Sequence, residues 1–159
     1  MNPNFTNADL EQMLEECIAE LKSLGYEVLP ITSIKFTKRK ARHLYGFCKP
    51  SKYCYFNYSK WEWEGDINVY IRITGNLAYT PIEYKQNLKT LVMHETIHAV
   101  KSNEKNTKKP VIPTFDTPHG ERFDAIKKRV ESELGYKNID GSTACGLRPV
   151  LENINKMFG

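Results

Sequence analysis

The segment 82–101 constrains the fold of this chain more than any other part of the sequence, because its apolar residues surround a helical axis. At about 100° per residue they fall on two nearly opposite sides of a helix. One side holds Leu88, Val92 and Ala99, and the other holds Met93, Ile97 and Val100. A helix that is apolar all round has to be covered on both sides. The sequence therefore predicts a long helix over residues 82–101, buried between two layers.

The same segment carries the pattern HExxH, formed by His94, Glu95 and His98. Histidines four residues apart on a helix lie about 40° apart around the axis, so both imidazoles can bind one metal ion. Glu95 projects from a neighbouring face, where it can reach a water on the metal without coordinating it. Two core histidines satisfied by hydrogen bonds are the alternative, but burying them with a carboxylate and no ion is costly. We expect one zinc ion here.

A catalytic zinc site needs a third protein ligand, and the remaining histidines are His43 and His119. His43 lies in a basic stretch that is typical of a solvated strand or loop. His119 follows Thr117 and Pro118, a capping residue and a proline that predict the start of a helix closing near residue 135. It also shares a stripe with apolar residues of that helix, so we predict His119 as the third ligand. The nearby carboxylates that could replace it are Glu121 and Asp124.

The rest of the chain predicts an α+β fold in a single domain, residues 1–159, with a core over about 7–135 and a C-terminal tail over 136–159. Helical spacing predicts a first helix over residues 7–24. Aromatic and β-branched residues over 28–74 predict a small antiparallel sheet, whose clearest strand is 67–74. Residues 101–118 have the composition of an irregular surface loop, and residues 149–158 predict a short last helix.

The composition is that of an ordinary globular protein, with 40% hydrophobic and 26% charged residues and a mean hydropathy of −0.54. No apolar stretch approaches the length of a membrane span. The first nine residues lack the basic start and apolar core of a secretory signal, so a cytoplasmic location is expected. The four cysteines form no CxxC pair and are expected to be reduced and buried. A Cys48–Cys54 disulfide is the alternative.

The net charge of +4 permits contact with polyanions without requiring it. The basic run at Lys38, Arg39, Lys40 and Arg42 could follow nucleic-acid phosphates. Nearby aromatic residues could stack on bases, although packing within a hairpin is the favoured interpretation for them; they are Tyr53, Tyr55, Phe56, Tyr58, Trp61 and Trp63. A DNA-binding module with a structural or idle zinc is therefore the main alternative to an enzyme.

Three segments together resemble the SprT-like metallopeptidases, which include bacterial SprT proteins and the eukaryotic Spartan protease. They are residues 91–99 around the HExxH pattern, residues 118–123 around a histidine-glycine pair, and the basic stretch 38–48, which ends at Gly46 and Cys48. The order of these segments also matches the family. The similarity covers roughly residues 10–135.

The resemblance implies a compact zincin-like domain in which a buried active-site helix carries HExxH and a second helix carries the third ligand. It implies that His94, His98 and His119 bind zinc and that Glu95 is the general base in peptide-bond hydrolysis by a zinc-activated water. It also implies a protein or peptide substrate and action on proteins bound to DNA. The cysteine cluster that some relatives carry near the C-terminus is absent from this sequence.

Overall fold

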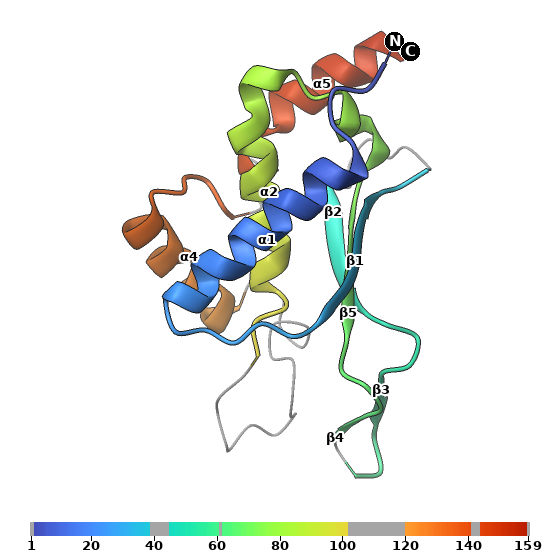
Figure 1. Cartoon of the computed structure of the whole chain (residues 1–159), viewed down its shortest axis with the longest axis vertical. Helices are drawn as coiled ribbons and strands as arrows, with labels where there is room; N and C mark the ends of the chain where they lie inside the picture. The colour runs from blue at the N-terminus through green and yellow to red at the C-terminus, as the bar shows by residue number, and fades with distance from the viewer. Residues whose placement is uncertain (1, 39–44, 61, 102–119, 141–143, 159) are drawn as a thin grey trace.

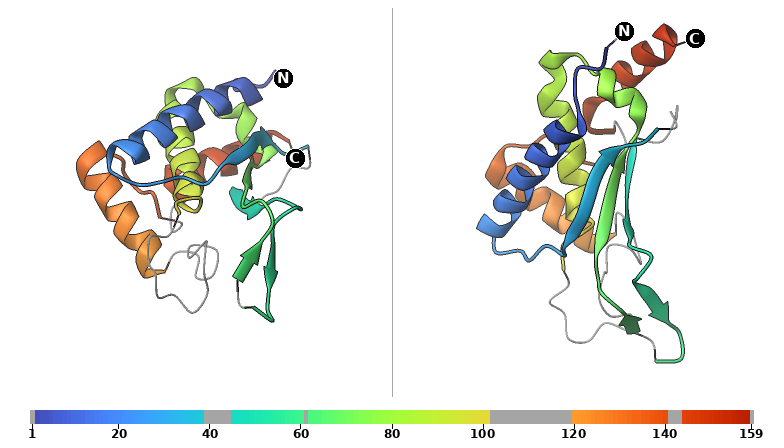
Figure 2. Two further views of the ribbon diagram at one scale, coloured as in Figure 1. Left: turned by 60° about the horizontal axis from the view of Figure 1, so that its bottom comes forward. Right: turned by 45° about the vertical axis from the view of Figure 1, so that its right-hand side comes forward.

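The computed structural model describes residues 2–38, 45–60, 62–101, 120–140 and 144–158. Within these ranges the chain is α+β, as predicted, and α1, α2 and α4 lie on one face of a small sheet (Figures 1 and 2). The helices are α1 (Asn7–Ser23), α2 (Lys85–Ile97), α4 (Glu121–Leu134) and α5 (Arg148–Met157), and the 3₁₀ turns are η1 (Gly75–Tyr79), η2 (Ile82–Tyr84) and η3 (Ala144–Gly146). The strands are β1 (Ile31–Phe36), β2 (Gly46–Pro50), β3 (Tyr55–Asn57), β4 (Glu62–Glu64) and β5 (Val69–Ile73).

The central sheet has the strand order β1-β5-β2 and is mixed. β2 runs antiparallel to β5, whereas β1 runs parallel to it. The prediction of an antiparallel sheet is therefore wrong for β1. Alternation of apolar and polar residues specifies which side chains face the core, but it carries no information about strand direction. β3 and β4 form a separate antiparallel hairpin that projects beyond one end of this sheet (Figure 1).

β5 is the central strand, and its burial follows the predicted alternation. Val69, Ile71 and Ile73 are buried, and Tyr70 and Arg72 between them are only partly covered. The strand is shorter than the predicted segment 67–74 but keeps its phase. The buried side chains point toward the helices, so the other face of the sheet carries the polar and aromatic members.

α1 forms as predicted and begins with a capping box between Thr6 and Asp9. Its buried residues recur at helical spacing: Leu10, Met13, Leu14, Cys17 and Leu21. This stripe packs over the sheet and against α2, so α1 supplies one of the two layers that the central helix requires (Figure 2).

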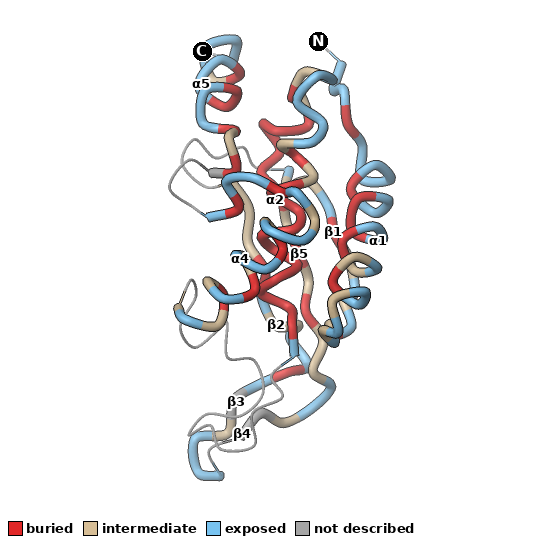
Figure 3. The backbone as a smooth tube through the Cα atoms, turned by 90° about the vertical axis from the view of Figure 1, so that its left-hand side faces the viewer, coloured by how far each residue is buried: buried red, intermediate tan, exposed pale blue. Residues whose placement is uncertain are grey.

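α2 is surrounded by other parts of the chain, as its sequence predicts. Every residue over 90–97 is buried, and Figure 3 shows this stretch crossing the centre of the molecule. The helix ends at Ile97, earlier than the predicted residue 101. The following backbone pairs with the segment before β1 instead, through a β-bridge between Val28 and Val100 and a 2.8 Å hydrogen bond from the Lys101 amide to the Glu27 carbonyl.

α4 begins at Glu121, with Gly120 as its N-cap, and ends at Leu134, with the left-handed Gly135 as its C-cap, close to where the sequence predicts its end. The predicted start at Thr117 and Pro118 lies outside the described residues. Phe123, Ile126 and Val130 are buried on one stripe, as predicted. This stripe places α4 against α2 as the second covering layer.

The C-terminal residues belong to the same core as the rest of the chain. Tyr136, Ile139 and Leu147 are buried between α4 and α5, and α5 adds Val150 and Leu151. These residues therefore form part of the packing around α2.

The four cysteines are all buried and unpaired by disulfides, so the alternative Cys48–Cys54 disulfide is not formed. Within the ranges that the structure describes, no helix combines the length and apolar character needed to cross a membrane.

Candidate metal centre

His94, Glu95 and His98 meet inside the protein at the C-terminal end of α2. All three side chains are buried, and one ligand atom from each lies within 4.8 Å of the others. The two imidazole rings are 5.2 Å apart between centroids. His98 follows the last residue of α2, but its φ of −61° and ψ of −22° are still helical. The spacing that brings both imidazoles to one side therefore survives the early end of the helix, and the group can hold a metal ion.

Glu95 is a carboxylate in an environment that disfavours charge. Its Oε1 lies 3.8 Å from His94 Nε2, and its buried Oε2 makes no hydrogen bond to any described residue. Burial raises the pKa of Glu95 from 4.5 to about 8. A bound cation would stabilise the ionised carboxylate, so this unsatisfied oxygen fits a metal site better than a packed core.

A hydrogen bond to the Ile139 carbonyl fixes which nitrogen of the neutral His94 ring carries the proton. His94 Nδ1 lies 2.5 Å from that oxygen. Because a carbonyl only accepts, Nδ1 carries the proton, and in the neutral ring Nε2, which lies 3.8 Å from Glu95 Oε1, is then the acceptor nitrogen. Ligating histidines usually donate their second ring nitrogen in this way, which orients the imidazole and raises its basicity. When neutral, the His94 ring is therefore in the tautomer that binds a metal through Nε2.

Ile139 is a site residue that the sequence interpretation missed, because its backbone rather than its side chain takes part. The chain reaches it through Asn138, whose φ of 59° is left-handed, a conformation that asparagine tolerates well. The Ile139 amide lies 3.3 Å from the Glu131 carboxylate of α4. An asparagine shortly after a helix C-cap is the one sequence signal of this turn.

Cys145 also contacts the Ile139 carbonyl, with its Sγ 3.6 Å from the oxygen. Its backbone is left-handed, with a φ of 60°, and its own carbonyl accepts a 3.3 Å hydrogen bond from the Asn87 side chain of α2. Burial raises the pKa of the Cys145 thiol, so this group is a neutral packing contact beside the site. The η3 turn thus binds the C-terminal segment to α2.

Phe123 of α4 covers both imidazoles. Its ring stacks on His98 at 4.7 Å between centroids with an interplanar angle of 29°, and it lies 4.9 Å from the His94 ring. The periodicity of α4 predicts that Phe123 faces the core, but its contact with both imidazoles depends on how α4 crosses α2. Phe123 keeps bulk water away from this side of the site.

The edge strand β2 lies on another side of Glu95. A Cβ added to Gly46 would be 2.9 Å from the Arg72 carbonyl and 3.7 Å from Glu95 Cγ. Glycine therefore allows β2 to pair tightly with β5 this close to the carboxylate. Two residues along, Cys48 is buried, and its pKa is raised by burial and then by the nearby Glu95.

The predicted third ligand, His119, lies outside the described residues. Of its two alternatives, Glu121 is exposed, and Asp124 pairs with Lys127 at 3.1 Å and with Lys128 at 2.9 Å. Hydrogen bonds from these lysines lower the pKa of Asp124. Neither carboxylate belongs to the metal group found among the described residues.

The residues predicted to contact nucleic acid are only partly described. Lys38 is exposed just after β1, whereas Arg39, Lys40 and Arg42, together with His43, fall outside the described ranges. Three aromatic residues of the hairpin region are exposed, although Tyr55 still packs within the hairpin, where its hydroxyl donates a 2.7 Å hydrogen bond to Glu64. Tyr53, Tyr55 and Tyr58 have 66%, 56% and 73% of their surface exposed.

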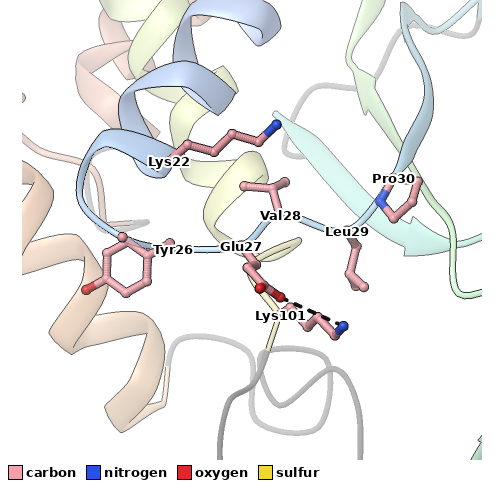
Figure 4. A pocket seen from close by; sticks show the side chains of 8 residues that line it. Lys22, Tyr26, Glu27, Val28, Leu29, Pro30 and Lys101 are labelled. Atoms are coloured by element: carbon pink, nitrogen blue, oxygen red, sulfur yellow. Dashed lines mark ion pairs between the residues drawn. The ribbon is translucent and has the colours of Figure 1, made fainter.

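A surface pocket of about 440 Å³ lies where the chain leaves the site (Figure 4). It is lined by the end of α1 at Lys22, by the segment 25–30 and by Lys101, whose ammonium lies 3.8 Å from the Glu27 carboxylate. The metal group does not line it. The pocket lies beside the backbone pairing between the segment before β1 and the residues that follow His98.

Substitution of Asn138 tests whether the Ile139 carbonyl orients His94. Asn138→Val should lower zinc affinity about 10- to 100-fold, because a β-branched residue disfavours the left-handed turn that presents the carbonyl. Asn138→Gly is the matched control and should keep the affinity. Competition with a chromophoric chelator measures both, with circular dichroism as the check on folding. Equal affinities in two folded variants would show that the turn does not control the ligand.

The raised pKa of Glu95 predicts how the stability of the metal-free protein depends on pH. Folded Glu95 holds its proton up to about pH 8, whereas the unfolded chain releases it near 4.5. Stability should therefore fall as pH rises through this window, by up to about 5 kcal/mol at 1.4 kcal/mol per unit. Denaturant unfolding of wild type and Glu95→Gln checks this, since the variant keeps the histidines. Parallel stability profiles for the two proteins would contradict the shift.

No protein-family model, curated protein or solved structure matches this chain. The resemblance to SprT-like peptidases therefore depends on the motifs quoted above. The function has to be inferred from the geometry of the site itself.

Proposed function

We propose that this protein is a zinc-dependent endopeptidase of the SprT-like, zincin-like type. The observation that carries the proposal is the buried His94–Glu95–His98 group, in which His94 Nδ1 is committed to a backbone carbonyl and Glu95 Oε2 lacks a hydrogen bond to any described residue. Two imidazole nitrogens beside a carboxylate are a donor set that suits zinc. A packed core without a metal ion would leave this carboxylate uncompensated.

In this proposal His94, His98 and His119 hold the ion, and Glu95 stays outside its coordination shell. When bound, zinc supplies Lewis acidity, which lowers the pKa of a coordinated water to about 7 and polarises a carbonyl. The protein's own contribution is to orient the ligands through Ile139 and Phe123. It also keeps solvent off the buried carboxylate.

Glu95 is the general base of the proposed reaction. It accepts a proton from the attacking water and passes it to the departing amine, as peptide-bond hydrolysis requires. In the metal-free protein, burial raises the pKa of this carboxyl. The charge of a bound cation would shift this pKa back down, toward the ionised base.

The edge strand β2 supports a peptide substrate. Its inner edge pairs with β5, and no strand among the described residues pairs with its outer edge. An extended peptide can bind such an edge through backbone hydrogen bonds. Because Gly46 has no side chain and lies close to Glu95, a peptide bound there would bring a backbone carbonyl near the carboxylate.

The second candidate is a DNA-binding module with a structural or idle zinc. The exposed Lys38 and the exposed tyrosines of the hairpin region support it. The two candidates combine in a protease acting on proteins bound to DNA, which the resemblance suggests. They differ in one measurable respect, because the binding module alone cleaves no peptide.

Glu95→Gln should retain bound zinc and lose peptide cleavage by at least about 100-fold, because the amide cannot accept the proton. Casein and disordered peptides, with and without DNA, are suitable substrates for wild type and variant. Glu83→Gln, an exposed glutamate before α2, is the matched control and should cleave normally. Turnover by Glu95→Gln would refute the base, and inactive zinc-loaded wild type would favour the binding module.

The third ligand is testable through metal content. Purified wild type should contain about one zinc per chain by atomic emission, and His119→Ala should lose most of it, because two imidazoles alone bind zinc weakly. His43→Ala is the matched control and should keep the metal. Unchanged zinc in His119→Ala would move the third ligand to Glu121 or Asp124.

A further inference from the structure

The face of the central sheet that points away from the helices has an unusual composition. Pairing of the strands across β5 arranges its outward side chains in two rows. One row is Lys35, Arg72 and Phe47, and the next is Ser33, Tyr70 and Lys49. No helix of the described residues covers this face (Figure 2). These two rows therefore present three cations and two aromatic rings, and none of their six residues is acidic.

The cations of this sheet face are not neutralised by described carboxylates. Lys35 and Lys49 are exposed. The Arg72 guanidinium donates to Ser33 Oγ at 3.0 Å and to the Ile71 carbonyl at 2.8 Å, which fixes its position while leaving its charge uncompensated. A cation that is already ordered loses little conformational entropy when it binds an anion.

The two rings lie among these charges. Phe47 and Tyr70 pack edge to face with centroids 6.1 Å apart. Lys49 Nζ lies 4.6 Å from the centre of the Phe47 ring, and the Arg72 guanidinium lies 4.9 Å from that of Tyr70. Both rings are only partly covered, although each is large and apolar. A ligand that uses the whole surface thus needs both negative charge and flat apolar groups.

We infer that this sheet face binds single-stranded nucleic acid, with phosphates at Lys35, Lys49 and Arg72 and bases against Phe47 and Tyr70. Alternating cations and aromatic rings match the alternation of phosphates and bases along a strand. Strands about 4.8 Å apart make a flat surface about 10 Å across, which suits two or three splayed nucleotides. Duplex DNA instead takes a helix or a two-stranded ribbon into its groove.

This inference goes beyond the proposed peptidase and does not depend on it. The surface lies on the opposite side of the sheet from α2, which carries the metal group. A strand bound there leaves the buried site unobstructed. Nucleic acid would accordingly act as a tether that brings the protein to its substrates, and the two activities can fail separately.

Fluorescence anisotropy with a labelled 15-nucleotide oligo-dT tests the inference at low salt, against a 15-base-pair duplex and poly-glutamate. Wild type should bind the single strand most tightly. Lys49→Glu should weaken binding at least tenfold and make the salt dependence shallower. Lys22→Glu, which makes the same charge change at an exposed residue of α1, should have a much smaller effect.

The aromatic contribution has its own variant pair. Phe47→Leu keeps an apolar side chain but removes the ring, and should weaken binding about tenfold, whereas Phe47→Tyr should restore it. Thermal unfolding confirms that each variant is folded. Glu95→Gln should bind oligo-dT as wild type does, which separates this result from the peptidase assay.

Several outcomes would overturn the inference. The first is that wild type does not bind oligo-dT at low salt. The second is that Lys22→Glu and Lys49→Glu lose the same amount of affinity for oligo-dT. The third is that wild type binds poly-glutamate or the duplex as tightly as oligo-dT and that Phe47→Leu does not change this affinity. Loss of binding in Lys38→Ala and Arg39→Ala, with none in Lys49→Glu or Phe47→Leu, would place the contact on the basic run after β1 instead.

Discussion

The hydrogen bond between His94 Nδ1 and the Ile139 carbonyl is the interaction on which the organisation of this protein depends. It joins the most deeply buried helix to a backbone group 45 residues further along the chain. The segment that carries this carbonyl is held by the C-cap of α4 at Gly135, by the turn at Asn138 and by the docking of the η3 turn on Asn87. The C-terminal residues are therefore linked to the ligand geometry as well as to the core. A change that loosens this segment would alter the orientation of an imidazole without touching it.

The burial of α2 explains why the site is chemically unusual. Layers on both sides of the helix exclude water from a carboxylate and two imidazoles that would otherwise be solvated. The free-energy cost appears in the raised pKa of Glu95 and in the missing hydrogen bond of its Oε2. A packed core has no use for such groups, whereas a cation compensates them. The layers that stabilise the fold therefore also desolvate the Glu95 carboxylate, and a bound cation would offset this cost.

Helical periodicity was sufficient to predict the buried faces of α1, α2 and α4, because spacing along a helix determines which side chains share a side. The HExxH pattern likewise predicted the group at His94, Glu95 and His98. Three features could not be predicted. The direction of β1 is invisible to alternation, the end of α2 depends on backbone pairing with the segment before β1, and the Ile139 carbonyl has no side-chain signature. Phe123 was predicted to face the core, but its contact with both imidazoles required the crossing of two helices.

The early end of α2 at Ile97 has an electrostatic consequence for this group. The peptide dipoles of a helix add up to roughly half a negative charge at its C-terminal end, and this charge fades within one turn. His94 and Glu95 lie within that last turn, and His98 is the C-cap residue that follows it. A helix continuing to residue 101 would have carried the negative pole away from the histidines. Because the helix stops at Ile97, its backbone dipoles contribute an attractive potential for a cation at this group, in addition to the contribution of the side chains.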